Sequence, residues 1–278
     1  HNPYNDNRMY ELYLEARNEN IKYYICERGA LPDSCFFDDT GFLLDSEYYK
    51  ECKWNHKISH QDREKTLQYI KNLRTSSSAL ETQNDRQPPE SLKKKLGIAA
   101  FENVLLVVFQ RPGDSVVTNF TGELGDYSNF VALIQDVAKN IPANWKILAK
   151  KHPLEDDSFT MPDSVQYVNE IHIHDLLEIS DTMITFNSGV GILSMIWGVH
   201  TIICGDAFYQ NDKINIHLTQ YEDIISYLIY PKKYDPEYRL RFLNYLLNKY
   251  YSFGKFITKK VKMPDGQNMT ATMDIVFY

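Results

Sequence analysis

One polar segment of this chain of 278 residues has the residue types of an anion-binding loop. It contains Lys150, His152 and Pro153 and directly follows residues 146–149, which are predicted to form a strand. Ammonium and imidazole groups donate hydrogen bonds to phosphate, and the ring of Pro153 restricts the turn that aims the imidazole. We therefore predict that this loop binds a phosphate group. An ordinary surface turn is the alternative interpretation.

A second polar segment joins the predicted strand 182–186 to a predicted helix at 190–197 and contains Asn187, Ser188 and Gly189. The glycine lets a ligand approach the backbone, Ser188 adds a hydroxyl donor, and the N–H groups at a helix start favour an anion. Neither of the two common glycine-rich phosphate motifs occurs in the sequence, so we predict that this segment replaces them. A helix capped by Ser188, with glycine for tight packing, is the alternative.

Two carboxylates are candidates for a chemical step. Asp114 lies in the loop after the predicted strand 104–109, together with Gln110 and Ser115, where a nucleophile or a base would lie. Glu27 follows an earlier predicted strand, and we expect it to face Asp114 across a cleft. Paired carboxylates act as acid, base or nucleophile in glycosyl chemistry. For Asp114, an ordinary Pro-Gly-Asp turn is the alternative.

His174 and Tyr209 are also predicted to border the crevice. His174 and the nearby His172 stand at alternate positions, which cannot share one helical face, and without a third ligand they predict no metal site. His174 is instead expected to lie in the first turn of a helix beside the crevice. Tyr209 ends the loop 205–209, which is expected to close over a base or a sugar.

Predicted strands and helices alternate from residue 104 to residue 204, which is typical of a doubly wound parallel sheet. The predicted strands are 104–109, 146–149, 165–168, 182–186 and 201–204. In such a sheet the carboxyl ends of the strands meet at one edge, and ligands bind in the crevice outside it. The polar loops described above are therefore expected to lie together.

The segment before this sheet is predicted to form a separate, smaller domain. Its expected elements are helices at 6–20 and 61–74, a strand at 22–26, turns within 31–49 and a linker at 76–89. The linker divides the chain into domains 1–89 and 90–278, the second closed by helices at 221–230 and 236–251. Because His1 stands in place of an initiator methionine, we expect the first domain to be truncated.

Composition excludes several classes of protein. The 30 basic and 37 acidic residues give a formal net charge of −7, which argues against a nucleic-acid partner. The four cysteines form no CxxC pair and favour a reducing compartment, so a cytoplasmic location is expected. No apolar run is long enough to span a membrane. The 20 tyrosines suit sugar-like ligands, with a tyrosine-rich surface as the alternative.

The order of these motifs resembles the capsule polysaccharide biosynthesis family, bacterial transferases of the acidic sugar Kdo. The motifs are Glu27-x-Gly29-x-Leu31-Pro32-Asp33, Gln110 with Asp114-Ser115, Lys150-x-His152-Pro153, Ser188-x-x-Gly191, Gly198 and Gly205-x-x-Phe208-Tyr209. The resemblance implies a GT-B-like α/β fold with two Rossmann-like domains built on parallel sheets, the first short or incomplete. It also implies a CMP-Kdo donor and no separate cofactor or metal.

The resemblance also implies roles for individual residues. Asp114 would lie at the anomeric carbon of Kdo and Glu27 at the donor sugar or the acceptor. The nucleotide would be held by Lys150, His152, Pro153, Asn187, Ser188 and Gly189, and the substrate by Gln110, Ser115, His174 and Tyr209. Retention of configuration would need either a double displacement through Asp114 or front-side attack. Leu193 departs from the family, which commonly has a Glu there that is assigned to the ribose.

The expected function is transfer of Kdo to a saccharide or glycolipid acceptor in bacterial surface polysaccharide biosynthesis. Peripheral contact with the inner membrane or with other polysaccharide-assembly enzymes is a further expectation. Two alternatives remain. The chain could use CMP-sialic acid or another nucleotide sugar, since the His-Pro and Ser elements are also similar to those of bacterial sialyltransferases. It could also be a saccharide-binding module without turnover.

Overall fold

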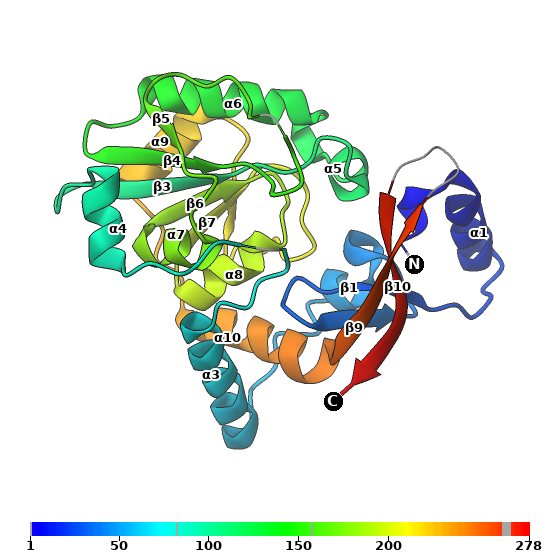
Figure 1. Ribbon diagram of the computed structural model, residues 1–278. Coiled ribbons are helices and arrows are strands. Elements are labelled where there is room, and N and C mark those ends of the chain that lie inside the picture. The colour runs from blue at the N-terminus through cyan, green and yellow to red at the C-terminus, as the bar shows by residue number, and fades with distance from the viewer. Residues whose placement is uncertain (1, 82, 157, 263–267) are drawn as a thin grey trace.

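The larger sheet of the protein has six parallel strands in the order β5-β4-β3-β6-β7-β8 (Figure 1). The computed structural model describes residues 2–81, 83–156, 158–262 and 268–278. The strands are β3 (Asn103–Val108), β4 (Trp145–Lys150), β5 (Val165–Tyr167), β6 (Thr182–Thr185), β7 (His200–Ile203) and β8 (Ile216–His217). The chain first adds strands on one side of β3 and then on the other. The switch point of the sheet therefore lies between β3 and β6.

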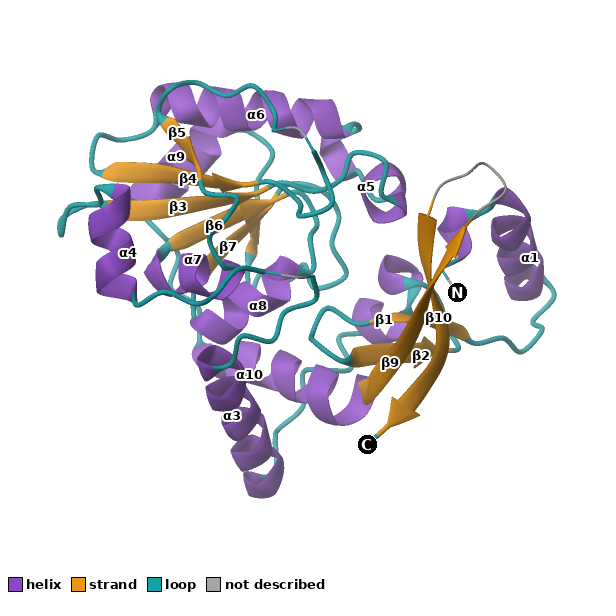
Figure 2. Cartoon of the chain, viewed as in Figure 1, coloured by secondary structure: helices purple, strands orange, loops and turns teal. Residues whose placement is uncertain are grey.

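Helices cover both faces of the parallel sheet (Figure 2). One face is covered by α6 (Tyr127–Asn140) and α9 (Tyr221–Ile229), the other by α4 (Pro89–Leu96), α7 (Ile173–Ile179) and α8 (Val190–Trp197). Alternate residues of β3 serve the two faces, with Leu105 packed in the cluster of Phe130 and Leu106 in that of Leu176. Burial on both faces explains why this strand is apolar at successive positions.

The smaller sheet is antiparallel, with the order β1-β2-β9-β10. Its strands are β1 (Ile25–Arg28), β2 (Ser34–Asp38), β9 (Tyr251–Lys262) and β10 (Asn268–Phe277). The helices around it and between the sheets are α1 (Asn7–Asn18), α2 (Glu47–Lys50), α3 (His60–Thr75) and α10 (Pro236–Tyr245). The short α5 (Ser115–Asn119) follows β3, and a π-helix (Leu246–Tyr250) joins α10 to β9. The 3-10 turns are Pro3–Asn5, Leu43–Asp45 and Gly122–Leu124.

The two sheets share one hydrophobic core. Phe36 of β2 and Tyr250 belong to the same buried cluster as Leu106 of β3 and Ile192 of α8. The rings of Phe36 and Tyr250 are stacked, with their centroids 5.5 Å apart. Continuous packing of this kind holds the two sheets in a defined relation, which fixes the walls of any cavity between them.

The fold confirms the α/β class and the parallel sheet, and it corrects several expectations about the first domain. No parallel pairing occurs in the smaller sheet among its described residues, and β2 lies within residues 31–49, which were expected to form turns. The predicted division placed residues 90–278 together. The backbone of Tyr251 instead pairs with that of Phe36, so β9 and β10 extend the N-terminal sheet. The helix expected at 236–251 is confirmed as α10 and the π-helix that continues it to Tyr250.

Within the described ranges, no helix combines the length and the apolar character needed to cross a bilayer.

Candidate active site at the switch point

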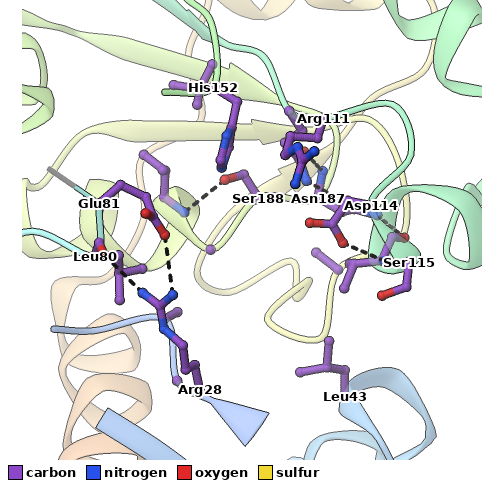
Figure 3. Close-up of a pocket in the computed structure, with 18 of the residues that line it drawn as sticks. Arg28, Leu43, Leu80, Glu81, Arg111, Asp114, Ser115, His152, Asn187 and Ser188 are labelled. Atoms are coloured by element: carbon purple, nitrogen blue, oxygen red, sulfur yellow. Dashed lines mark hydrogen bonds and ion pairs between the residues drawn. The ribbon is translucent and has the colours of Figure 1, made fainter. Parts of the chain in front are cut away.

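A cavity of about 570 Å³ lies between the two sheets, at the switch point of the parallel sheet. One side, which we call the sheet-edge wall, includes residues 110–111, 113–115, 150–153 and 187–190 of the loops after β3, β4 and β6. The other side, the opposite wall, consists of residues 27–30 and 79–81. The predicted meeting of the three polar loops is therefore confirmed (Figure 3).

Asp114 is exposed in the cavity and caps the short helix α5. Its Oδ1 accepts a hydrogen bond from the N–H of Val116 at 3.0 Å, which holds the carboxylate in one orientation. The Oγ of the adjacent Ser115 accepts a hydrogen bond from Nδ2 of Asn2 at 2.8 Å. This contact ties the N-terminal residues to the loop after β3. Asp114 thus presents an oriented carboxylate to the cavity.

Gln110 and Asn187 form a buried pair that connects the loops after β3 and β6. Nε2 of Gln110 donates to Oδ1 of Asn187 at 2.9 Å, and the N–H of Asn187 donates to Oε1 of Gln110 at 2.9 Å. Nδ2 of Asn187 also donates to the carbonyls of Val116 and Phe120. Both side chains line the cavity, yet their polar atoms are engaged with protein groups. Gln110 and Asn187 therefore hold the loops of this wall in place and leave few polar atoms for a ligand.

His152 presents a neutral imidazole to the cavity. Its Nδ1 accepts a hydrogen bond from the N–H of Leu154 at 3.2 Å, which leaves the proton of the neutral ring on Nε2. Burial lowers the pKa of His152 below its usual 6.5, and nearby Arg111 lowers it further, whereas Glu81 and Asp114 raise it. At neutral pH the ring can therefore donate a hydrogen bond through Nε2 without carrying a charge.

Lys150 lies in the same wall, but its ammonium group has protein partners. Nζ donates to the carbonyls of Asn169 at 2.6 Å and Ile171 at 2.7 Å, and the residue is only 5% exposed. Burial lowers its pKa to about 8. Lys150 thus holds the turn before α7 and supports the His152 loop, with its charge directed at backbone carbonyls. The neighbouring Pro153 lines the cavity as expected.

The Ser188 loop lies at the start of α8 and closely approaches the opposite wall. Oγ of Ser188 accepts a hydrogen bond from the N–H of Val190 at 3.2 Å, which leaves the hydroxyl proton available for a ligand. A Cβ added at Gly189 would lie 3.1 Å from Cβ of Ala30. Glycine therefore lets the two walls come into close contact here, because a larger residue would force Ala30 to shift.

Tyr209 supports this loop from behind the cavity. It is 1% exposed, its hydroxyl donates to the carbonyl of Ser188, and it is absent from the cavity lining among the described residues. A Cβ at Gly191 would collide with its hydroxyl. Asp206, Ala207 and Phe208 of the loop 205–209 line the cavity, as expected of this loop. The substrate role expected of Tyr209 itself is wrong, because Gly191 leaves a space that its ring fills within the core.

His174 was also placed incorrectly. It is fully buried in α7, where its ring packs on Trp197 with centroids 4.5 Å apart. Nδ1 of His174 lies 3.3 Å from the carbonyl of Ser76, and Nε2 of His172 lies 3.2 Å from that of Ser77. Both histidines therefore anchor the segment predicted to be a linker, and His174 does not contact the cavity.

That segment reaches the cavity and forms part of the opposite wall. Arg28 donates from its terminal nitrogens to Oε1 of Glu81 at 3.3 Å and to the carbonyl of Leu80 at 3.0 Å. Glu27 lines the same wall, where one of its carboxylate oxygens accepts a hydrogen bond from the N–H of Arg28. The predicted position of Glu27 across from Asp114 is consistent with this arrangement.

The sequence of residues 43–256 matches the family described as "Capsule polysaccharide biosynthesis protein". The chain belongs to this family.

Solved structures agree with the family at the level of the fold. The structure titled "Thermosulfurimonas dismutans KpsC, beta Kdo 2,4 transferase" is similar with a TM-score of 0.66 and 18% identity, over 94% of this chain and 81% of that one. The structure titled "Thermosulfurimonas dismutans KpsC, beta Kdo 2,7 transferase" gives a TM-score of 0.56 and 17% identity, over 92% and 78%. The α/β fold is thus the GT-B-like fold expected of this family. No curated protein matches the chain.

Leu193 lies in α8 and contributes an apolar surface to the cavity. It is 3% exposed and belongs to the shared core. The carboxylate that the family commonly has at this position is therefore replaced by a side chain that cannot accept a hydrogen bond from a ribose.

Arg28, Glu81 and Arg111 line the cavity and were missed as site residues in the sequence. Arg28 directly follows Glu27, and Arg111 lies in the same loop as Asp114, so a cation close to a predicted carboxylate could have suggested both. Glu81 lies in a segment with the composition of a linker, and nothing in its local pattern points to a cavity. Only the anchoring of that segment on α7 brings it there.

Proposed function

We propose that this member of the capsule polysaccharide biosynthesis family transfers Kdo from CMP-Kdo to a saccharide or glycolipid acceptor. The observation that carries the proposal is the convergence of Asp114, His152 and Ser188 in one cavity at the switch point of the sheet. Such crevices bind nucleotides in folds of this type. The similar KpsC structures, whose titles name beta Kdo transferases, support the choice of sugar.

The sheet-edge wall has the donors that a departing CMP phosphate requires. Nε2 of His152 and the hydroxyl of Ser188 supply hydrogen bonds, and the positive end of the α8 dipole lies at the same loop. Hydrogen bonds to an ionised acceptor are stronger than those between neutral groups. These groups stabilise the negative charge that develops on the phosphate as its bond to the sugar breaks.

Asp114 serves as the nucleophile in this proposal. One of its carboxylate oxygens forms a bond to the anomeric carbon of Kdo, while the bond from that carbon to the phosphate oxygen breaks and its electron pair leaves with CMP. An acceptor hydroxyl then forms a bond to the same carbon as the bond to Asp114 breaks. The hydroxyl proton passes to a base, a role that we assign to Glu27. Two inversions retain the configuration of the sugar.

A panel of donors tests the proposal. The protein is incubated with a saccharide acceptor and CMP-Kdo, CMP-sialic acid or a UDP-linked hexose, and released CMP or UDP is measured together with thermal stability. A ligand that binds the native state raises the melting temperature. We expect CMP and CMP-Kdo to stabilise the protein and CMP-Kdo alone to be consumed. Consumption of CMP-sialic acid or a UDP sugar in its place would replace the proposed donor, and binding without any turnover would support a saccharide-binding module.

Intact-protein mass spectrometry tests the mechanism separately. With CMP-Kdo and no acceptor, we expect the wild-type protein to gain the mass of one Kdo residue and Asp114→Ala to gain none. Asp126→Ala is the matched control, because Asp126 caps α6 in the same way through the N–H of Ser128 and does not line the cavity. An adduct on Asp114→Ala would exclude Asp114 as the nucleophile.

A further inference from the structure

Arg111 lies on the same tight turn as Asp114. The N–H of Asp114 donates to the carbonyl of Arg111 at 3.1 Å, and both residues line the cavity. Figure 3 shows the guanidinium group of Arg111 near Asp114 and on the side of the cavity that also carries His152. The charge of Arg111 also acts on His152, so the three groups share one electrostatic environment.

One nitrogen of the Arg111 guanidinium group is hydrogen-bonded within the protein, and the two terminal nitrogens have no protein partner among the described residues. Nε donates to Oε1 of Glu155 at 2.8 Å, and the Arg111 side chain is 49% exposed. A guanidinium oriented in this way can bind a carboxylate with two parallel hydrogen bonds.

The three other lysine and arginine residues that line the cavity have protein partners, and Nζ of Lys151 donates to the carbonyl of Asp156. Nζ of Lys150 donates to two backbone carbonyls, and the terminal nitrogens of Arg28 donate to Glu81 and to the carbonyl of Leu80. His152 donates as a neutral ring. Arg111 lies close to the proposed nucleophile, and its two terminal nitrogens can donate charged hydrogen bonds to a second anion.

The proposed donor class carries such a second anion. An ulosonic acid linked to CMP has its carboxylate on the same anomeric carbon that bears the phosphate. With that carbon at Asp114, the carboxylate lies within a few bonds of the turn that holds Arg111. A carboxylate that loses water on binding needs compensating hydrogen bonds, and those from a cation are the strongest.

We propose that Arg111 binds the carboxylate of the ulosonic acid donor and that this contact selects such donors over nucleotide-linked neutral sugars. Glu155 acts as a positioning residue that holds the guanidinium at Nε. The inference rests on the proposed function, because it takes Asp114 to be at the anomeric carbon. It adds a recognition site for the sugar to the phosphate site of His152 and Ser188.

Calorimetry with CMP and with freshly prepared CMP-Kdo tests this assignment. Arg111→Gln is expected to weaken CMP-Kdo binding by about 10- to 100-fold, the loss typical of a hydrogen bond to a charged group, and to change CMP affinity by less than about twofold. Arg111→Lys keeps the positive charge but loses the two parallel donors of the guanidinium group. Its affinity for CMP-Kdo is expected to lie between those of the wild type and Arg111→Gln. Unchanged affinity for CMP-Kdo, or an equal loss for CMP and CMP-Kdo, would overturn the assignment.

The matched control is Arg63→Gln. Arg63 pairs with Glu237 between α3 and α10, has a similar exposure of 37%, and does not line the cavity. Its removal should leave both affinities unchanged. Wild-type protein that binds CMP but neither CMP-Kdo nor CMP-sialic acid would refute the proposed function itself. Wild-type protein that binds CMP-Kdo as tightly as Arg111→Gln does would refute only the role of Arg111.

Discussion

The two walls of the cavity are built differently. In the sheet-edge wall, buried groups hold the loops in place: Gln110 and Asn187 bond to each other, and Lys150 bonds to two carbonyls. In the opposite wall, the pair between Arg28 and Glu81 is partly exposed, with side-chain exposures of 48% and 32%. Buried networks of this kind are strongly ordered, whereas exposed ion pairs contribute little to stability.

This difference separates two tasks in the proposed reaction. A donor phosphate and its leaving charge require donors fixed before the reaction, which the sheet-edge wall supplies. The acceptor must contact the wall that faces the donor. The opposite wall is polar and partly exposed, so its residues can change to suit different acceptors with little loss of stability. We therefore assign the donor to the sheet-edge wall and the acceptor to the opposite wall.

The strongest test of this division is the loss of the proposed nucleophile. Asp114→Ala should lower Kdo transfer by about 10⁴-fold or more, as expected for removal of a covalent nucleophile, and leave CMP affinity within about twofold. Initial rates of CMP release and calorimetry measure the two effects. Asp126→Ala controls for the lost helix cap. Normal turnover of Asp114→Ala would remove Asp114 from the mechanism.

A second test concerns the support of the sheet-edge wall. Asn187→Ala leaves the amide of Gln110 and the carbonyls of Val116 and Phe120 without their partner, which should lower the free energy of unfolding by about 3 kcal/mol. Thermal unfolding would show a melting temperature lower by about 6–12 °C. The control is Asn140→Ala, which removes one exposed hydrogen bond to Asp136. Equal stability of the two variants would contradict a supporting role.

A third test compares ligand binding by the two walls. His152→Ala should weaken CMP binding by about 10-fold or more, because Nε2 would no longer donate to a charged phosphate. Arg28→Ala should leave CMP affinity unchanged and raise the KM of the acceptor. Calorimetry with CMP separates the two variants. Unchanged CMP affinity in His152→Ala, or a matching loss in Arg28→Ala, would remove the distinction between the walls.

The smallest effect concerns the anchor of the opposite wall at low pH. Burial and the charge of His172 lower the pKa of His174 from 6.5 to about 4. Between these values the unfolded chain binds a proton that the folded chain does not, so stability is present above pH 6.5 and falls as the pH drops toward 4. For His174 alone, the loss at pH 5 is about 2 kcal/mol.

Urea unfolding at pH 7.5 and pH 5 measures this dependence. His174→Asn keeps a donor for the carbonyl of Ser76 but cannot take up the proton. We expect its stability to change less between the two pH values than that of the wild type. An identical pH dependence in both proteins would assign the effect to the other buried histidines, His152, His172 and His200, whose pKa values burial also lowers.

Local patterns predicted most of the parallel sheet because its central strands are short, apolar and followed by polar loops, whereas β8, with only two residues, was missed. The run ending at Val108 and the one ending at Thr185 have this form, and the loops after them meet at the switch point. The smaller sheet could not be predicted in this way. Its β2 pairs with β9, which lies more than 200 residues later, and no local pattern encodes such a pairing.

The sequence by itself determined which loops form the sheet-edge wall and that Asp114, His152 and Ser188 lie in them. Each of these loops directly follows a predicted strand, and the carboxyl ends of parallel strands meet at one edge of their sheet. Only the tertiary structure decided what each side chain does. Tyr209 and His174 are turned into the core, and Arg111 is left with open donors, because partners distant in sequence determine the orientation of a side chain.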